Sequence, residues 1–178
     1  MRSTPLTHAG PPTPVTVFLI GMTIRKPWRV DAWGSTAHAM TRMITELRAN
    51  RAAVVAGEDV HDLGFLHAEM GVFARGPAVV QYWASPEHLY AYARDEAREH
   101  LPAHKEFYAR VRHEAVGIWH ETYAVPADGI ETFYRNSGER GLARAFGAQP
   151  LTGALRRQAR DRHAAQAVQR PVRFRRVP

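Results

Sequence analysis

The chain has 178 residues, of which 45% are hydrophobic and 10% aromatic, and it contains no cysteine. This length and composition fit one compact domain with its own core. The lack of cysteine excludes disulfides, iron–sulfur clusters, zinc–thiolate sites and thiolate nucleophiles. The net charge of +7 arises in residues 151–178, which hold eight Arg and one Asp. Residues 1–150 are therefore formally neutral and give no electrostatic case for nucleic-acid binding.

The two ends of the chain predict extensions, and the part between them predicts one domain. Residues 1–14 are rich in Pro and hold no apolar region of the kind found in signal peptides, so they predict a flexible lead. Residues 151–178 predict a basic extension, solvated or bracing a subunit. No stretch approaches the roughly 20 apolar residues of a bilayer span. We expect a cytoplasmic protein with no membrane or nucleic-acid partner, folded over residues 15–150.

The first half of this domain predicts a strand, a helix and a hairpin. The sequence VTVFLIGMTI over residues 15–24 is β-branched, apolar and too short for a free-standing helix, so it predicts a strand. Apolar side chains then recur every three or four residues from Trp33 to Leu47, which predicts a helix of about five turns that covers a sheet. The stretches DLGFLHAEMGVFA and AVVQYWA, separated by an Arg-Gly-Pro break, predict an antiparallel hairpin.

The second half predicts two helical pieces and a last strand. Ser85 is a good N-cap for a helix that starts at Pro86, and Pro102 is expected to end that helix and start another that runs to about Arg112. EAVGIWHETYAV predicts the fourth strand, and residues 126–150 are too apolar for a free linker, so we expect them to pack back on the domain. The order β-α-β-β-α-β is that of a ferredoxin-like α+β domain. A second copy commonly covers the free sheet face, so we expect a homodimer, built as a dimeric α+β barrel.

His120 is the candidate catalytic residue. Alternation along the fourth strand places it in a row with Ile118 and Thr122, with Trp119 on the opposite face. A histidine among aliphatic residues in a strand is more often part of the core than a catalyst. Its proximity in sequence to two further histidines shifts the interpretation toward proton transfer.

His100 and His104 are candidate metal ligands. His104 shares a predicted helix face with Phe107, whereas His100 precedes the helix break at Pro102. No HExxH motif occurs, so zinc is not indicated. Either imidazole could instead be the single axial ligand of haem over an apolar, aromatic slot. The alternative, two surface histidines on a charged helix, stays open.

Four further residues are candidates for lining a substrate pocket. His67 is expected to share a strand face with Phe65 and Glu69, and Gln81 is expected to share one with Trp83. These polar groups would orient a ligand in an otherwise apolar pocket. The candidate lining is His67, Gln81, Trp83 and Trp119.

Several segments resemble a family of small bacterial and fungal monooxygenases related to a fumagillin-cluster protein. The segments are VTVFLIGMTI, HDLGFLHAEM, VVQYWASPEHLYAYAR, HLPAHKEF and GIWHETY, in that order and with similar spacing. The resemblance covers about residues 15–147. It implies a ferredoxin-like dimeric barrel akin to the antibiotic-biosynthesis monooxygenases.

The segments EHLYAYA, HLPAHKEF and IWHETY are also similar to the HLE-W, HPTH and YHEV segments of haem-dependent aldoxime dehydratases. In those enzymes one histidine binds haem iron and another is the distal acid–base. The resemblance implies haem b bound by His104 or His100 and proton transfer by His120. HLPAH is one residue longer than HPTH, which leaves open which histidine faces the iron, and the distal Ser and Arg have no counterparts.

These observations favour a haem-binding enzyme of secondary metabolism that acts on a small organic molecule, by monooxygenase or dehydratase-like (lyase) chemistry. A cofactor-independent monooxygenase, whose oxidisable substrate supplies electrons to dioxygen, is an alternative. A non-catalytic α+β barrel that binds a ligand or haem is a third. A visible spectrum separates the haem hypotheses from the cofactor-free one, since only haem gives a Soret band.

Overall fold

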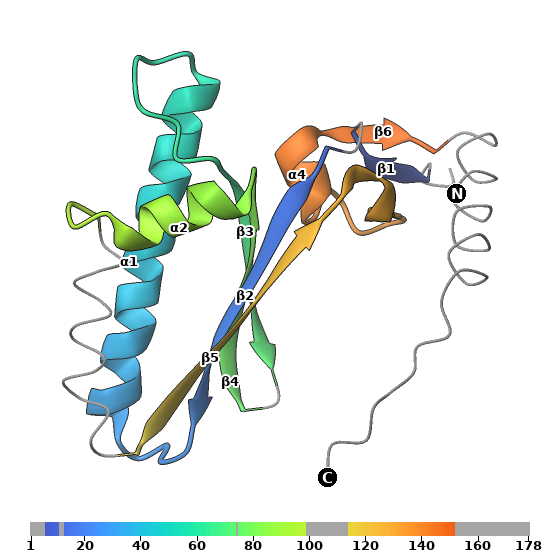
Figure 1. Cartoon of the computed structure of the whole chain (residues 1–178). Helices are drawn as coiled ribbons and strands as arrows, with labels where there is room; N and C mark the ends of the chain where they lie inside the picture. Colours follow the sequence, from blue (N-terminus) through green and yellow to red (C-terminus); the bar gives the residue numbers. More distant parts are fainter. Residues whose placement is uncertain (1–5, 11–12, 74, 99–113, 152–178) are drawn as a thin grey trace, which may run out of the picture.

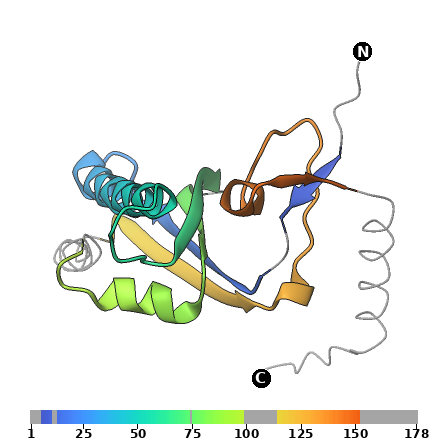
Figure 2. The same cartoon turned by 90° about the horizontal axis from the view of Figure 1, so that it is seen from above.

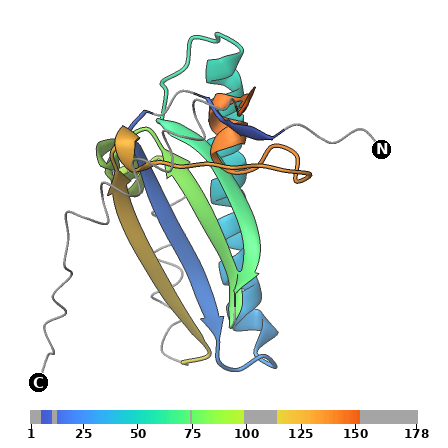
Figure 3. The same ribbon diagram turned by 90° about the vertical axis from the view of Figure 1, so that its right-hand side faces the viewer.

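The main sheet has four antiparallel strands in the order β3-β4-β2-β5 (Figure 3). The computed structural model describes residues 6–10, 13–73, 75–98 and 114–151. The four strands are β2 (Val15–Ile24), β3 (Phe65–Phe73), β4 (Gly76–Trp83) and β5 (Val116–Val125). The last of them, β5, pairs with the first, β2, at one edge of the sheet, and β4 lies between β2 and β3. This order confirms the ferredoxin-like α+β fold.

The two described helices that belong to this unit lie on one side of the sheet (Figures 1 and 2). α1 (Val30–Val55) has 26 residues and is longer than predicted, because good helix formers continue beyond Leu47 as far as the turn at Gly57. α2 (Pro86–Arg94) begins at the predicted N-cap, Ser85. The second helical piece, predicted to run from Pro102 to about Arg112, lies outside the described residues.

The main core fills the space between these helices and the sheet. Trp83 is fully buried and packs edge-to-face on Phe65, with ring centroids 5.4 Å apart. Its indole N–H donates to the Gln81 side-chain oxygen at 3.0 Å. Both buried polar groups thereby have a partner, and without one their burial would lower the stability of the fold. The other large members of this core are Ile44, Leu47, Leu63, Val79, Leu89 and Tyr92.

The segment after β5 packs back on the opposite side of the sheet, as expected. It contains the short elements η2 (Ala127–Gly129), α4 (Leu142–Phe146) and β6 (Ala148–Pro150). β6 pairs with β1 (Thr7–Ala9), so part of the lead predicted to be flexible forms a strand. The two segments lie far apart in sequence, and strand pairing between them has no local signal.

The strand register defines two faces of the sheet. The helix face carries Phe18 of β2, Gln81 of β4 and Thr122 of β5 in one row across the strands. The outer face carries alternate residues, including Leu19 and Val80. Most of the outer face near β1 is covered by the segment after β5, through an apolar cluster around Val15, Val17, Leu66, Tyr82 and Leu142.

A β-bulge changes the expected faces of β3. The register against β4 shifts between Phe65 and His67, so Phe65 pairs with Trp83 but His67 pairs with Tyr82. Phe65 is buried in the main core, whereas His67 lies on the outer side with Glu69. The expectation that His67 shares a face with Phe65 is therefore wrong, because the extra residue of a bulge reverses the alternation.

Candidate functional site

His120 lies on the helix face of the sheet, in β5, opposite Ile20 of β2. Its ring packs against Phe18 with the ring centroids 5.6 Å apart and a 44° interplanar angle. The side chain is exposed in the single chain. The alternation predicted for β5 is confirmed: His120 and Ile118 share one face and Trp119 lies on the other. An aromatic neighbour and an accessible imidazole fit proton transfer to a bound molecule.

An apolar pocket adjoins His120 between the helix face and α1. Ile20, which pairs with His120, and Ile118, two residues away along β5, are both part of its wall. The pocket has a volume of about 70 Å³, smaller than the roughly 300 Å³ at which small-molecule sites begin. Three methionines line it, Met22, Met40 and Met70. Methionine side chains are flexible, so this wall can adapt to a larger occupant.

The four predicted lining residues lie on both faces of the sheet and do not form one pocket. Gln81 and Trp83 are on the helix face, at 6% and 0% exposure, and belong to the core. Trp119 is on the outer face, where its indole covers Gly21 and meets Phe73 edge-on at 5.9 Å. His67 is also on the outer side, because of the bulge in β3.

His67 is part of a polar cluster at the β3 edge that the sequence did not predict. Its Nε2 lies 3.8 Å from Glu69 Oε1, which also accepts the backbone N–H of Gly141 at 2.7 Å. Burial is the largest influence and lowers the pKa of His67; Glu69 opposes it, and Arg48 and Arg144 act in the same direction as burial.

Two tyrosines border the same cluster. Burial raises the pKa of Tyr82 above its usual value, and the charge of Glu69 acts in the same direction. Burial also raises the pKa of Tyr134, whose hydroxyl accepts the N–H of Ala143 at 3.3 Å. Both phenols therefore stay protonated around neutral pH. The only sequence signal for the cluster was the spacing of His67 and Glu69, since the other members come from a loop about 70 residues away in sequence.

The residues predicted to hold haem, His100, His104 and Phe107, lie outside the described residues. In the part of the chain that the structure describes, no three His, Asp or Glu side chains gather as a metal site. None of the helices described is both long and apolar enough to cross a bilayer.

The sequence of residues 15–142 matches the family described as "Monooxygenase af470-like". The chain belongs to this family. The match spans the whole four-stranded unit and reaches the start of α4, so the monooxygenase resemblance seen in the sequence is confirmed. No curated protein matches the chain.

Two solved structures are similar to this member of the Monooxygenase af470-like family at low sequence identity. SnoaB, a cofactor-independent oxygenase from Streptomyces nogalater, is 12% identical, with a TM-score of 0.39 over 64% of this chain and 94% of its own. A dimeric protein of unknown function with a ferredoxin-like fold, from Bacteroides fragilis, is 14% identical, with a TM-score of 0.37 over 62% and 95%. Nothing in these comparisons supports haem. The chemistry has to be argued from this chain's own residues.

Proposed function

We propose that the protein is a monooxygenase that needs no bound cofactor and acts on a small, easily oxidised organic molecule at the helix face of the sheet. Membership of a family described as monooxygenase supports the reaction class. The helix face supports the location, because it combines an apolar pocket with an accessible imidazole. Confinement and a base are what a reaction needs when the substrate itself supplies the electrons.

The observation that carries the proposal is the placement of His120. The strands of the main sheet are described over their full length, and in them His120 is the only ionisable side chain on the helix face. The other ionisable strand residues, such as Glu69 and Tyr82, are on the outer side. A proton transferred at the helix face therefore has one candidate carrier within the sheet.

The proposed reaction balances without an added reductant. His120 takes a proton from an activated C–H of the substrate, and the carbanion reduces dioxygen as the C–O bond forms. The protonated imidazole returns the proton to the hydroperoxide. A second proton leaves the same carbon, the O–O bond breaks, and water departs, so that R₂CH₂ and O₂ become R₂C=O and H₂O. The substrate is the only electron donor, and His120 is regenerated.

We also propose that a second copy of the chain covers the free part of the outer face. Away from the segment after β5, this face presents Tyr123 and Phe73 at 49% and 45% exposure, beside Leu19 and Val80. An antiparallel sheet with helices on one face stays soluble most simply when its other apolar face is buried. This proposal agrees with the homodimer expected from the sequence.

Replacing His120 tests the enzymatic proposal. We expect His120→Ala to fold normally and to consume oxygen roughly 10² times more slowly with compounds that carry an activated CH₂ group, such as 1,3-diketones. His38→Ala, at an exposed position of α1, is the matched control and should leave the rate unchanged. Oxygen uptake by purified protein gives the rate, and circular dichroism checks the fold. Equal rates for His120→Ala and the wild type would return His120 to a structural role.

A visible spectrum of the same preparation tests the absence of a cofactor. We expect no band beyond the aromatic region in protein that is active. A Soret band close to one haem per chain, lost together with activity on haem removal, would overturn the cofactor-free proposal in favour of the haem hypothesis.

A further inference from the structure

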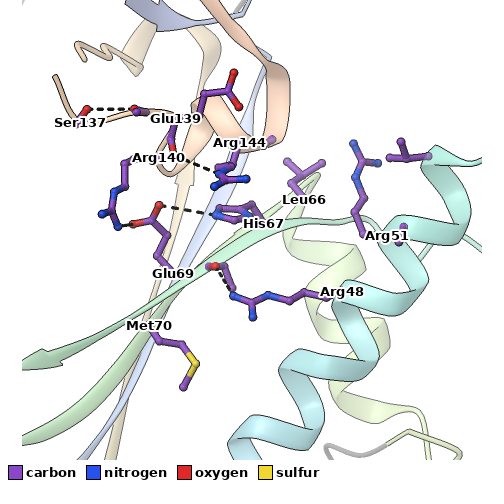
Figure 4. A pocket seen from close by; sticks show the side chains of 15 residues that line it. Arg48, Arg51, Leu66, His67, Glu69, Met70, Ser137, Glu139, Arg140 and Arg144 are labelled. Atoms are coloured by element: carbon purple, nitrogen blue, oxygen red, sulfur yellow. Dashed lines mark hydrogen bonds and ion pairs between the residues drawn. The ribbon is translucent and has the colours of Figure 1, made fainter. Parts of the chain in front are cut away.

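A second, larger cleft runs along the β3 edge of the sheet (Figure 4). Of its lining residues, only Met70 also lines the pocket beside His120. The C-terminal half of α1 forms one wall, residues 137–145 form the other, and β3 is the floor. Its volume is about 1080 Å³, at the upper end of the roughly 300–1,000 Å³ typical of small-molecule sites. The cleft is therefore large enough for a ligand of its own.

The cleft is lined by four arginines and two glutamates, so its formal charge is positive. Arg48 and Arg51 come from α1, and Arg140 and Arg144 come from the facing segment. The two acidic residues of the lining are Glu69 and Glu139. Charges of one sign that converge from two facing walls raise the local concentration of the opposite charge.

Three of these arginines keep their charge available. Arg48 donates to the carbonyl oxygen of Ala68 at 3.0 Å, and Arg144 donates to that of Glu139 at 3.2 Å. Bonds to backbone carbonyls orient a guanidinium without neutralising it. Arg51 makes no hydrogen bond or ion pair with another described residue. Arg140 alone approaches a carboxylate, that of Glu69 at 3.9 Å.

The positive charge of the cleft affects the pKa of His67, which lies on its floor. Burial is the main reason that the pKa of His67 is low, but Arg48 and Arg144 lower it further, from opposite walls, while Glu69 raises it. Arg51, Arg140 and Glu139 are the other charged groups of the lining. An anion bound here would oppose the arginines and raise the pKa of His67.

Apolar side chains lie among the arginines. Val55 of α1 and Leu66 and Met70 of β3 contribute hydrocarbon to the lining. Guanidinium groups bind carboxylates in a planar, bidentate manner, and aliphatic neighbours favour a ligand with an apolar body. We propose that this cleft binds an organic carboxylate, with its carboxylate among Arg48, Arg51 and Arg144 and its hydrocarbon part along Leu66 and Met70.

Calorimetric titration of the full chain with 2-naphthoate tests the proposal. We expect one molecule to bind per chain, and 2-naphthamide, which has the same shape without the charge, to bind at least roughly tenfold more weakly. Affinity for naphthoate should also fall as sodium chloride rises from about 0.05 M to about 0.5 M. Inorganic phosphate should bind more weakly than naphthoate. Equal affinity for the two would overturn the proposal that the hydrocarbon part of the ligand contributes to binding.

Charge-removing variants locate the binding. Arg51→Gln combined with Arg144→Gln should weaken naphthoate binding by roughly tenfold or more, while Arg75→Gln, in the β3–β4 turn, should leave it unchanged. His120→Gln should also bind naphthoate like the wild type, which separates this cleft from the oxygenation site. In addition, the His67 imidazole signals should titrate at higher pH when naphthoate is bound. Unchanged binding by the folded double variant would overturn the proposal.

Discussion

Gly21 lies at a point where the sheet leaves no room for a side chain. A Cβ added there would lie 2.5 Å from the indole Cζ2 of Trp119 and 2.8 Å from the Cβ of Ala78. Neither neighbour moves freely, because Ala78 is buried in β4 and Trp119 is held against Phe73. We expect Gly21→Ala to lower the free energy of unfolding by about 1–3 kcal/mol, the usual cost of overpacking. Urea denaturation measures this change.

Gly117→Ala is the matched control for that substitution. Gly117 lies on the same face in the neighbouring strand, but its added Cβ would approach Thr23 Cβ only to 3.8 Å. We expect its unfolding free energy to stay within about 0.5 kcal/mol of the wild type. Equal stability of the two variants would mean that Trp119 does not pack over Gly21.

His67 should make the stability of the fold depend on pH. Burial, the largest cause, lowers the pKa of His67 below its usual 6.5. As pH falls through about 6.5, the unfolded chain takes up a proton that the folded chain does not. The folded state is therefore favoured above this pH and loses stability below it. We expect His67→Gln to lose less stability than the wild type between about pH 7.5 and pH 5.

Denaturation at a series of pH values measures that difference, with His38→Gln on α1 as the control for removing an exposed histidine. Parallel pH curves for His67→Gln and the wild type would contradict the partial burial of His67. The same measurement is free of any assumption about catalysis.

At the scale of elements, the side chain of Ser85 caps the start of α2. The Ser85 hydroxyl accepts the backbone N–H of His88 at 3.5 Å and is 2.9 Å from that residue's Nδ1. We expect Ser85→Ala to lower the unfolding free energy by about 1 kcal/mol, as loss of an N-cap usually does. Ser35→Ala, within α1, removes only a hydroxyl bonded to the preceding turn and should change stability by less than about 0.5 kcal/mol. Chemical denaturation compares the two, and an equal effect would show that Ser85 is not a cap.

α2, β5 and β3 show what could and could not be predicted from the sequence. The Ser-Pro-Glu start of α2 and the alternation of β5 are local patterns, and both are confirmed. The bulge in β3 has no local signature, and it moved His67 away from Phe65. The polar cluster depends on Glu69 and Gly141 meeting across 72 positions, and no periodicity encodes such a contact. The local elements were thus predictable from the sequence. The face of the sheet on which His67 lies, and the contact between Glu69 and Gly141, were not.

At the scale of the whole molecule, the sheet separates two environments. The helix face combines an apolar pocket with His120, and the β3 edge combines arginines with a half-buried histidine. The apolar walls of the first environment suit an organic substrate, while the positive charge of the second suits a charged ligand. A ligand in one site and a substrate in the other need not compete.

Burial of the free outer face predicts a dimer, which a charge at its centre should disrupt. Leu19 of β2 lies between Val80 of β4 and Glu121 of β5 in the strand register. We expect the wild type to sediment as a dimer of about 40 kDa, twice the 20.0 kDa of one chain. Leu19→Glu should sediment as a folded monomer, because it places a second carboxylate directly opposite Glu121 and would bury two like charges in the interface. Thr45→Glu, at an exposed position of α1, adds the same charge away from this face and should stay dimeric. A wild type that remains monomeric at tens of micromolar would contradict the proposed assembly, and the outer face would then be free in solution.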